Sequence, residues 1–336
     1  MIRLSFILPC HNVERYIADC LDSIFSQDLS GDEFEVICVN DCSTDGTRDV
    51  IVSYAERYSN LTLIDHEENM TAGGARNTGV KVARGEYIWF VDPDDMIMPN
   101  SAIEVFDVAK GKGVDVLMFN FKIVNENKES VESVRYFVDS EAMSGQEYVL
   151  TYTPNHFSEH CMVWRCLFRT RFLQERQLWY PIMRKAQDVS FLWKVILVAE
   201  RVASVSGIYY CYRSNPYSVA NKTLDAHVAF SERILFANEI GRLLESSGLK
   251  ISPLVRQDME KTLRWCANSN LELICQVSKD ERSRYFDEIV RNKSAVRRVK
   301  PYMNRKQKRI FVTLGGKSLW LFKIKLLECL NRYRRK

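Results

Sequence analysis

The chain contains 336 residues, of which 46% are apolar and 27% charged, and this composition is typical of a globular protein with about two domains. It has no run of about 18 apolar residues and no signal peptide pattern, so we expect neither a membrane-spanning helix nor secretion. The net charge of +4 hides an asymmetry: residues 291–336 hold 16 lysines and arginines against one acid, whereas residues 1–290 carry a net charge of −11.

The ten cysteines show no C-x-x-C spacing, and several lie in or beside apolar runs. This pattern indicates reduced, buried thiols in a reducing compartment, and it argues against a zinc site. We therefore expect a cytoplasmic protein.

Apolar runs alternate with segments of helical spacing through the first part of the chain. The apolar runs predict strands at residues 4–9, 34–41, 61–65, 86–92 and 114–124. The helical segments between them cover residues 13–27, 43–58, 72–83 and 100–110. Strands that alternate with helices of about a dozen residues predict an α/β fold, in which a mainly parallel, Rossmann-like sheet carries helices on both faces.

The pattern is less regular after residue 130 and becomes helical after residue 218. Residues 133–138 and 205–213 predict further strands, residues 161–178 a strand that leads into a helix, and residues 186–200 a helix. We place a domain boundary near Asn221, which gives an α/β domain over residues 1–220. A helical C-terminal region with the basic tail covers residues 221–336.

Polar clusters follow the first four predicted strands. They are PCHN at residues 9–12, NDCSTDGT at 40–47, NMTAGGARN at 69–77 and DPDD at 92–95. Ligands of such sheets bind beyond the carboxyl ends of the strands, so the four clusters predict one site built from four loops.

Three carboxylates crowd the end of the fourth predicted strand: Asp92, Asp94 and Asp95. Clustered aspartates repel one another unless a cation shares the site, and oxygen ligands suit Mg²⁺ or Mn²⁺. The alternative is that Asp94, Asp95 or Asn100 caps the helix that follows.

The segment GGARN offers a phosphate site. Paired glycines at a helix start let backbone N–H groups approach an anion, and Arg76 supplies a matching charge. A plain turn with a solvated arginine is the alternative. The segment does not match G-x-G-x-x-G, which argues against a dinucleotide dehydrogenase.

Two further acids complete the predicted site. Asp41, at the tip of the second strand, can accept from a base N–H or a ribose hydroxyl, or it is a turn residue. Asp188 lies in the first turn of a predicted helix, whose positive end favours the ionised carboxylate, although such aspartates are often ordinary first-turn residues. Metal, diphosphate, nucleoside and a carboxylate base together predict group transfer from a nucleotide diphosphate donor.

Residues 6–27, 35–47, 73–95 and 186–195 resemble the successive sequence blocks of family 2 glycosyltransferases with the GT-A fold. The resemblance extends from about Leu4 to Val219. It implies an inverting, metal-dependent transferase that moves a sugar from a nucleoside diphosphate sugar, most often a UDP-sugar, to a hydroxyl group. The acceptor would be a glycan or a lipid-linked acceptor in bacterial cell-surface polysaccharide assembly.

The resemblance also assigns roles to individual residues. Pro9 and Asn12 match the first nucleotide-contacting block, and Asp41 matches the acid that reads the base. Gly74 and Arg76 match the block near the diphosphate and ribose. The D-x-D motif matches Asp92 near the ribose or donor sugar, Asp94 as the ligand of Mn²⁺ or Mg²⁺, and Asp95 as an accompanying donor-site carboxylate. Asp188 matches the catalytic base, although Gln187 precedes it where many relatives have glutamate.

The basic C-terminal tail indicates a second partner. Its apolar segment, Leu319–Leu330, is too short to span a bilayer, but its aromatic, leucine and cationic residues fit adsorption to an anionic membrane surface. A helix packed on the acidic body is the alternative. Nucleic acid is not expected as a partner because no recognised binding module accompanies the tail.

Two other classes of function remain open. A sugar nucleotidyltransferase would also use metal and nucleotide, but it would normally carry a glycine-rich loop where this chain has PCHN. A non-catalytic protein that binds nucleotide-sugars or anionic surfaces would be expected to lack a carboxylate, yet all the predicted site acids are present.

Overall fold

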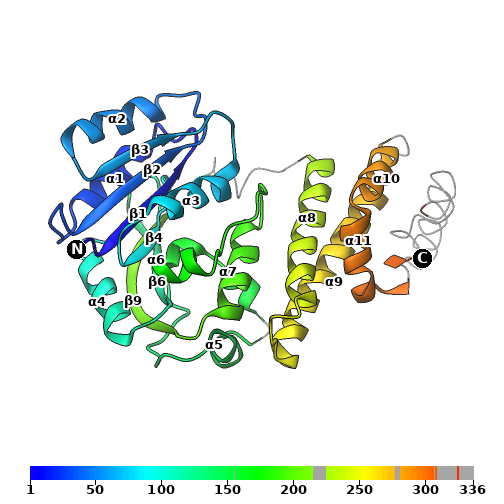
Figure 1. Cartoon of the computed structure of the whole chain (residues 1–336). Coiled ribbons are helices and arrows are strands. Elements are labelled where there is room, and N and C mark those ends of the chain that lie inside the picture. Colours follow the sequence, from blue (N-terminus) through cyan, green and yellow to red (C-terminus); the bar gives the residue numbers. More distant parts are fainter. Residues whose placement is uncertain (155, 215–224, 277–280, 306, 309–323, 325–336) are drawn as a thin grey trace. The chain divides into compact units, whose positions relative to one another are not determined.

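The computed structural model describes residues 1–154, 156–214, 225–276, 281–305, 307–308 and 324 (Figure 1). The chain divides into two compact units, Met1–Asn221 and Lys222–Lys336. The first unit is built on one sheet and the second on helices.

The strands of the first unit form a single sheet in the order β3-β2-β1-β4-β8-β6-β9-β5, with β7 paired to β6. Their bounds are β1 Leu4–Cys10, β2 Phe34–Asn40, β3 Leu61–Asp65, β4 Tyr87–Phe90, β5 Met96–Ile97, β6 Val116–Val124, β7 Ser130–Val134, β8 Cys166–Arg169 and β9 Val202–Arg213.

The sheet is mixed, not wholly parallel. β3, β2, β1 and β4 lie side by side and run parallel, as predicted (Figure 1). β8 then runs antiparallel to both β4 and β6, whereas β6 and β9 are parallel to each other. The predicted fifth strand, β6, is therefore separated from β4 by a strand that comes about fifty residues later in the chain. Hydropathy patterns are local and do not show which strands share hydrogen bonds.

Helices cover both faces of the sheet, as predicted. Their bounds are α1 Ile17–Phe25, α2 Thr47–Arg57, α3 Thr71–Val82, α4 Ala102–Lys112, α5 Gly145–Tyr152, α6 Thr170–Glu175 and α7 Gln187–Val198, with short 3₁₀ turns η1 Phe157–His160 and η2 Val163–Arg165.

Alternate side chains of β1 show how the two faces are covered. Phe6 and Leu8 point to one face and pack in a core cluster with residues of α1, α2 and α4. Ile7 points to the other face, where α3 lies so close that a Cβ at Gly79 would be 2.4 Å from Ile7 Cγ2. Glycine at this position lets α3 lie directly on β1.

The parallel strands end at one edge of the sheet. Cys10 at the end of β1 is the register partner of Asn40 at the end of β2, and Asn40 is the partner of Asp65 at the end of β3. Just after β4, the Val91 N–H donates to the Ile7 carbonyl at 3.0 Å, so the loop that begins at Asp92 leaves the same edge. The polar clusters predicted to share one site therefore leave the sheet together.

The second unit contains α8 Ala226–Glu245, α9 Pro253–Gln276, α10 Arg282–Arg291, α11 Lys293–Val299 and the 3₁₀ turn η3 Lys300–Tyr302. Asp225 caps α8, since its carboxylate accepts from the N–H groups of His227 and Val228. Among the described residues, no helix is both long and apolar enough to cross a membrane. The apolar tail segment Leu319–Leu330 lies outside the described residues except for Ile324.

Candidate functional site

The loops after β1 and β2 are joined by Asn12. Its backbone adopts φ 54°, and its side-chain carbonyl accepts from the Thr44 N–H at 2.7 Å. The Asn12 N–H donates in turn to Ser43 Oγ at 3.1 Å. Asn12 is exposed at the rim, whereas Pro9 is buried in β1 opposite Val39. Pro9 is therefore part of the packed end of β1.

Asp41 is fixed by groups from the loop that leads to α3. Its side chain is almost fully buried, and its Oδ1 accepts from the Met70 N–H at 2.7 Å. The same oxygen lies 2.8 Å from His66 Nδ1, and His66 Nε2 lies 2.9 Å from Thr78 Oγ1. The contacts with His66 and the Met70 N–H therefore fix the orientation of the Asp41 carboxylate. The sequence interpretation missed His66, which follows β3 without any motif.

The glycines at the start of α3 allow a close approach to the segment before α7. A Cβ at Gly73 would lie 2.5 Å from Gln187 Oε1 and 3.0 Å from the Pro181 carbonyl. A Cβ at Gly74 would lie 2.6 Å from Met70 Cβ. Gly73 thus brings the first turn of α3 against the start of α7, which carries Asp188, whereas Gly74 makes room for Met70 just before α3.

Arg76 joins two of the predicted site acids. Its Nη2 lies 2.7 Å from Asp92 Oδ1, and its Nη1 lies 3.0 Å from Asp188 Oδ1. The guanidinium is 4% exposed and lies over the ring of Tyr180. Burial disfavours its charge, but the carboxylates of Asp188 and Asp92 outweigh this and raise the pKa of Arg76. Three residues that are remote in the sequence therefore form one charged cluster at the edge of the sheet.

The pKa of Asp188 is raised to about 6. Burial is the main cause and the Asp92 charge adds to it, whereas Arg76 and a hydrogen bond from the Val163 N–H act in the opposite direction. The sequence interpretation considered only the helix end, which favours the ionised form. Burial of the carboxylate, which the sequence does not show, raises the pKa instead. Asp188 is thus a carboxylate whose pKa lies near neutral pH.

The Asp92–Asp95 loop turns its acids in two directions. Asp92 and Asp94 are half-buried at the edge of the site, whereas Asp95 is 1% exposed. Asp95 Oδ2 accepts from the Tyr210 hydroxyl at 2.8 Å, and Oδ1 accepts from the Arg213 N–H at 2.7 Å. Both oxygens are engaged by the protein, so the prediction that Asp95 faces the donor is corrected: its carboxylate holds the loop from behind.

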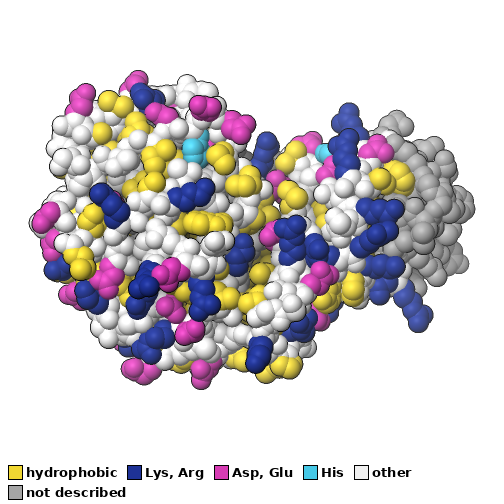
Figure 2. All heavy atoms as spheres, in the orientation of Figure 1, with side chains coloured by type: hydrophobic (Ala, Val, Ile, Leu, Met, Phe, Trp, Pro, Cys, Tyr) yellow, Lys and Arg dark blue, Asp and Glu magenta, His cyan; other side chains and the backbone are white. Residues whose placement is uncertain are grey.

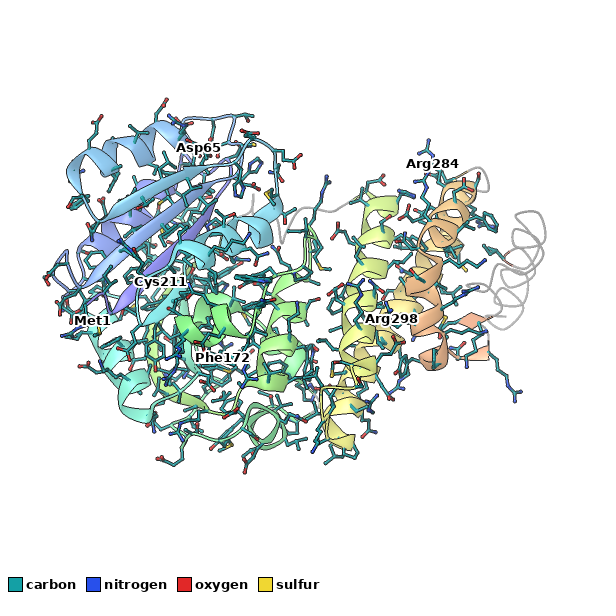
Figure 3. The ribbon with its side chains drawn as sticks, in the orientation of Figure 1. Met1, Asp65, Phe172, Cys211, Arg284 and Arg298 are labelled. Carbon is teal, nitrogen blue, oxygen red and sulfur yellow. The ribbon has the colours of Figure 1, made fainter. Side chains whose placement is uncertain are left out.

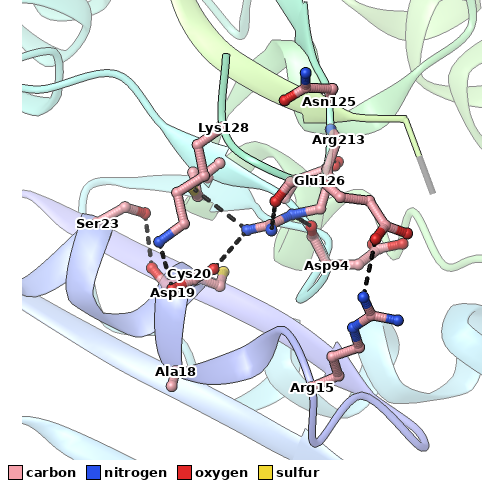
Figure 4. Close-up of polar contacts among 12 residues, drawn as sticks. Arg15, Ala18, Asp19, Cys20, Ser23, Asp94, Asn125, Glu126, Lys128 and Arg213 are labelled. Carbon is pink, nitrogen blue, oxygen red and sulfur yellow. Dashed lines mark hydrogen bonds and ion pairs between the residues drawn. The ribbon is translucent and has the colours of Figure 1, made fainter.

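Arg213 supports the same loop. Its side chain is 3% exposed, with Nε donating to the Asp94 carbonyl at 3.0 Å and Nη2 bound to Asp19 Oδ2 at 2.8 Å (Figure 4). Asp19 also binds Lys128 Nζ at 2.7 Å, and these two cations lower the pKa of Asp19 against the effect of burial. Sequence reasoning missed Arg213; the one signal was a charged residue at the end of the apolar strand YYCYR.

The donor set suits a metal that is shared with a ligand. Among the residues that the structure describes, no group of three histidine, cysteine or acidic side chains could enclose an ion. Asp92 and Asp94 nevertheless supply two half-buried carboxylates two residues apart in the loop. Mg²⁺ commonly binds through one or two carboxylates together with substrate phosphates, so these residues fit such an ion.

A sheet with helices on both faces, whose polar loops meet at the carboxyl ends of parallel strands, defines an α/β fold in which ligands bind at that edge of the sheet. The model of the family described as "Glycosyl transferase family 2" matches residues 5–172. The chain belongs to this family.

Individual relatives agree with this assignment. The chain is 30% identical over 253 residues to "Uncharacterized glycosyltransferase EpsJ" of Bacillus subtilis. This match covers 71% of this chain and 70% of the relative. It is also 30% identical over 216 residues to "Poly(ribitol-phosphate) beta-glucosyltransferase" of Bacillus spizizenii, covering 63% of this chain. That match spans only 32% of the relative's own length.

The fold also has a solved counterpart. The structure of S. aureus TarS residues 1–349 in complex with UDP-GlcNAc superposes with a TM-score of 0.70 at 23% identity. The match covers 99% of this chain and 92% of that chain. The predicted GT-A-type fold with a helical C-terminal region is therefore confirmed.

Proposed function

We propose that the chain is an inverting glycosyltransferase that uses a nucleoside diphosphate sugar, with a UDP-sugar as the first candidate. The acceptor is a hydroxyl group of a glycan or lipid-linked acceptor in cell-surface polysaccharide assembly. One observation carries the proposal: Arg76 joins Asp92 of the D-x-D loop to Asp188, a carboxylate with a pKa of about 6. Family membership supports it, as do the names of the poly(ribitol-phosphate) relative and of the TarS complex with UDP-GlcNAc.

Each predicted site residue receives a role in this proposal. Asp41, oriented by His66, would read the base, and Pro9 and Asn12 would belong to the segment that contacts the nucleotide beside it. Gly74 and Arg76 would lie near the diphosphate and ribose, and Asp92 near the ribose or donor sugar. Asp95 would act from behind, through its bonds to Tyr210 and Arg213.

Asp188 would be the general base. Its pKa of about 6 leaves it ionised at neutral pH yet basic enough to accept a proton from an acceptor hydroxyl. The hydroxyl oxygen bonds to the anomeric carbon as the bond from that carbon to the diphosphate breaks, and the proton passes to Asp188. One displacement inverts the anomeric configuration, so no enzyme nucleophile is required.

Asp94, together with Asp92, would hold Mn²⁺ or Mg²⁺. When bound, such an ion neutralises charge that develops on the leaving diphosphate. The two half-buried carboxylates support an ion that is shared with the phosphates of the donor.

We also propose an anionic membrane surface as a partner of the second unit, at the cytoplasmic face. Residues 291–308 contain no acid, and exposed cations occur at Arg291, Lys293, Arg297, Lys300 and Arg305. Lysines and arginines gather over α10 and α11 in Figure 2, and Arg284 and Arg298 can be followed on these helices in Figure 3. Each well-placed cation near an anionic leaflet contributes about 1 kcal/mol.

Ligand-dependent thermal unfolding tests the proposed function. Nucleoside diphosphate sugars with UDP, GDP and dTDP are compared with and without Mn²⁺, and any stabilising donor is then used in a transfer assay. We expect metal-dependent stabilisation by UDP-sugars, since binding to the folded state alone raises its stability. Stabilisation by GDP- or dTDP-sugars instead of UDP-sugars would assign a different donor. No stabilisation by any of these donors would contradict the nucleotide-sugar site. Binding without any transfer or donor hydrolysis would favour a non-catalytic binding protein.

A further inference from the structure

The 3₁₀ turn η2 lies between the proposed base and the D-x-D loop. Val163, Trp164 and Arg165 are each at most 5% exposed, so this three-residue turn is part of the core. The Val163 N–H faces the Asp188 carboxylate and lowers the pKa of that group. One end of the turn therefore lies beside the base.

Trp164 connects the same turn to β9 and β4. Its ring is stacked on that of Tyr210, with centroids 4.6 Å apart and an interplanar angle of 16°. Its carbonyl accepts from Trp89 Nε1 of β4 at 2.9 Å. Trp164 is thus bound to β4 through its carbonyl and to β9 through its ring.

The hydroxyl of Tyr210 reaches the D-x-D loop itself. It accepts a hydrogen bond from the Asp92 N–H at 3.1 Å and donates one to Asp95 Oδ2 at 2.8 Å. Tyr210 is fully buried, so it holds the loop without reaching a substrate. A continuous set of contacts therefore leads from Asp188 through Val163, Trp164 and Tyr210 to Asp92.

Arg165 anchors the turn from the other side. Its Nε donates to the Phe119 carbonyl of β6 at 3.3 Å, and its guanidinium carbon lies 4.0 Å from the centre of the Phe137 ring. Within the described part of the chain, its two Nη atoms have no hydrogen-bond partner. The aromatic rings around Arg165 and its hydrogen bond to β6 fix the guanidinium. They thereby fix the position of η2.

We propose that Trp164 and Tyr210 are positioning residues that hold the D-x-D loop at a set distance from Asp188. The inference rests on the proposed function, because it concerns the separation of base and leaving-group site. Proton transfer and departure of a diphosphate occur together, so a displacement of about 1 Å between these groups can cost about 100-fold in rate. The stacked pair of Trp164 and Tyr210 is buried in the core and is therefore a stiff connection.

The competing explanation is that the two rings only fill the core. Hydroxyl deletion separates the two explanations, because Tyr→Phe keeps the ring and its packing. β9 offers matched controls: the Tyr209 hydroxyl binds Glu104 on α4 at 2.6 Å, and the Tyr212 ring is stacked on the same Trp164 at 5.6 Å. Within the described residues, neither control hydroxyl forms a hydrogen bond with the Asp92–Asp95 loop.

The first experiment measures amide hydrogen exchange at Asp92 in the ligand-free protein. Loss of the hydroxyl that accepts from this N–H should speed exchange about tenfold in Tyr210→Phe, and leave it unchanged in Tyr209→Phe and Tyr212→Phe. Unchanged exchange at Asp92 in Tyr210→Phe would overturn the proposal. This measurement requires neither donor nor acceptor.

The second experiment measures transfer kinetics of the same variants. Tyr210→Phe should lower kcat/KM about tenfold, and Trp164→Phe should lower it in the same direction. The double variant should lose less than the product of the two single effects, because both residues act as one unit. The proposal is overturned if Tyr210→Phe lowers the melting temperature but retains wild-type kinetics. It is also overturned if the effects of the two single variants on kcat/KM multiply, because the rings then only fill the core.

A wild-type protein without transfer activity would refute the proposed function. The exchange data alone would then decide whether Trp164 and Tyr210 hold the loop.

Discussion

Arg76 is the residue on which the charge balance of the site depends. Its buried guanidinium serves two carboxylates, Asp92 and Asp188, and within the described part of the chain neither carboxylate forms an ion pair with a second cation. Removing a charge from such a cluster leaves the remaining charges uncompensated, which shifts their pKa values and lowers stability. Substitutions here should therefore be interpreted through pH profiles as well as through rates.

The acid limb of the pH profile of kcat/KM should reflect the protonation of Asp188. Its pKa is raised to about 6, and only the ionised carboxylate accepts a proton, so kcat/KM should fall as the pH drops below about 6. Arg76 lowers this pKa, so Arg76→Gln should move the limb to higher pH. Arg84→Gln, which removes an arginine from the remote Glu35 pair, is the control and should leave the limb in place. A limb at the same pH in all three proteins would contradict the base assignment.

Removing the base should separate chemistry from binding. Asp188→Asn keeps the size of the side chain but cannot accept the proton, so kcat should fall by roughly 10²–10⁴-fold. Donor affinity, measured by calorimetry, should stay within a few-fold of wild type. An unchanged kcat would exclude Asp188 as the base.

Asp94 should carry the metal response. Asp94→Asn removes one of the two half-buried carboxylates of the loop, and we expect it to abolish the Mn²⁺-dependent part of donor binding measured by calorimetry. Asp107→Asn, at an exposed position on α4, is the matched control. Retention of the full metal effect in Asp94→Asn would remove the ligand assignment.

At the scale of secondary-structure elements, the site depends on how closely α3 approaches its neighbours. Gly79 brings the helix onto β1, and Gly73 brings its first turn against the segment before α7. This approach lets Arg76 reach Asp92 and Asp188 from a buried position. The glycines of GGARNTG are therefore required by helix packing as much as by any anion.

Gly79→Ala tests this packing. The added Cβ would lie 2.4 Å from Ile7 Cγ2, so strand and helix must separate, and we expect a loss of about 1–3 kcal/mol in the free energy of unfolding. Gly111→Ala on α4 is the control, because nothing lies within 4 Å of its Cβ, and it should be neutral or stabilising by up to about 1 kcal/mol. Equal stabilities of the two variants in urea denaturation would contradict the close-packing argument.

At the scale of the whole molecule, the two units differ in charge and in construction. The first carries the candidate site, whereas the described residues of the second carry a run of exposed cations at 291–308. Deleting this run would remove α11, whose Ala295, Val296 and Val299 are buried. The test of this cationic run should therefore substitute its exposed residues and leave the buried residues of α11 unchanged.

Charge reversal tests the proposed membrane contact. Lys293, Arg297 and Lys300 are exposed, and replacing all three by glutamate should reduce co-sedimentation with anionic vesicles, since each cation contributes about 1 kcal/mol near the surface. A matched control reverses three exposed cations of the first unit, Arg57, Lys110 and Arg171. Equal vesicle binding by both triple variants would exclude the α11 cations as the anchor.

The sequence by itself determined the alternation of strands and helices, the edge of the sheet at which the candidate site residues gather, and the family. These features are local, because a hydrophobic repeat or a D-P-D-D cluster lies within a few consecutive residues. Loops that follow parallel strands must also leave the sheet at one edge, which explains why Asp41, Arg76 and Asp92 can be grouped from their positions in the sequence.

Only the tertiary structure decided how these residues interact. The insertion of β8 between β4 and β6 depends on hydrogen bonds between distant segments, and no local pattern reflects them. The raised pKa of Asp188 depends on burial, and the inward turn of Asp95 depends on Tyr210 and Arg213. Burial and charge pairing arise when segments more than a hundred residues apart meet, so spacing along the chain cannot show them.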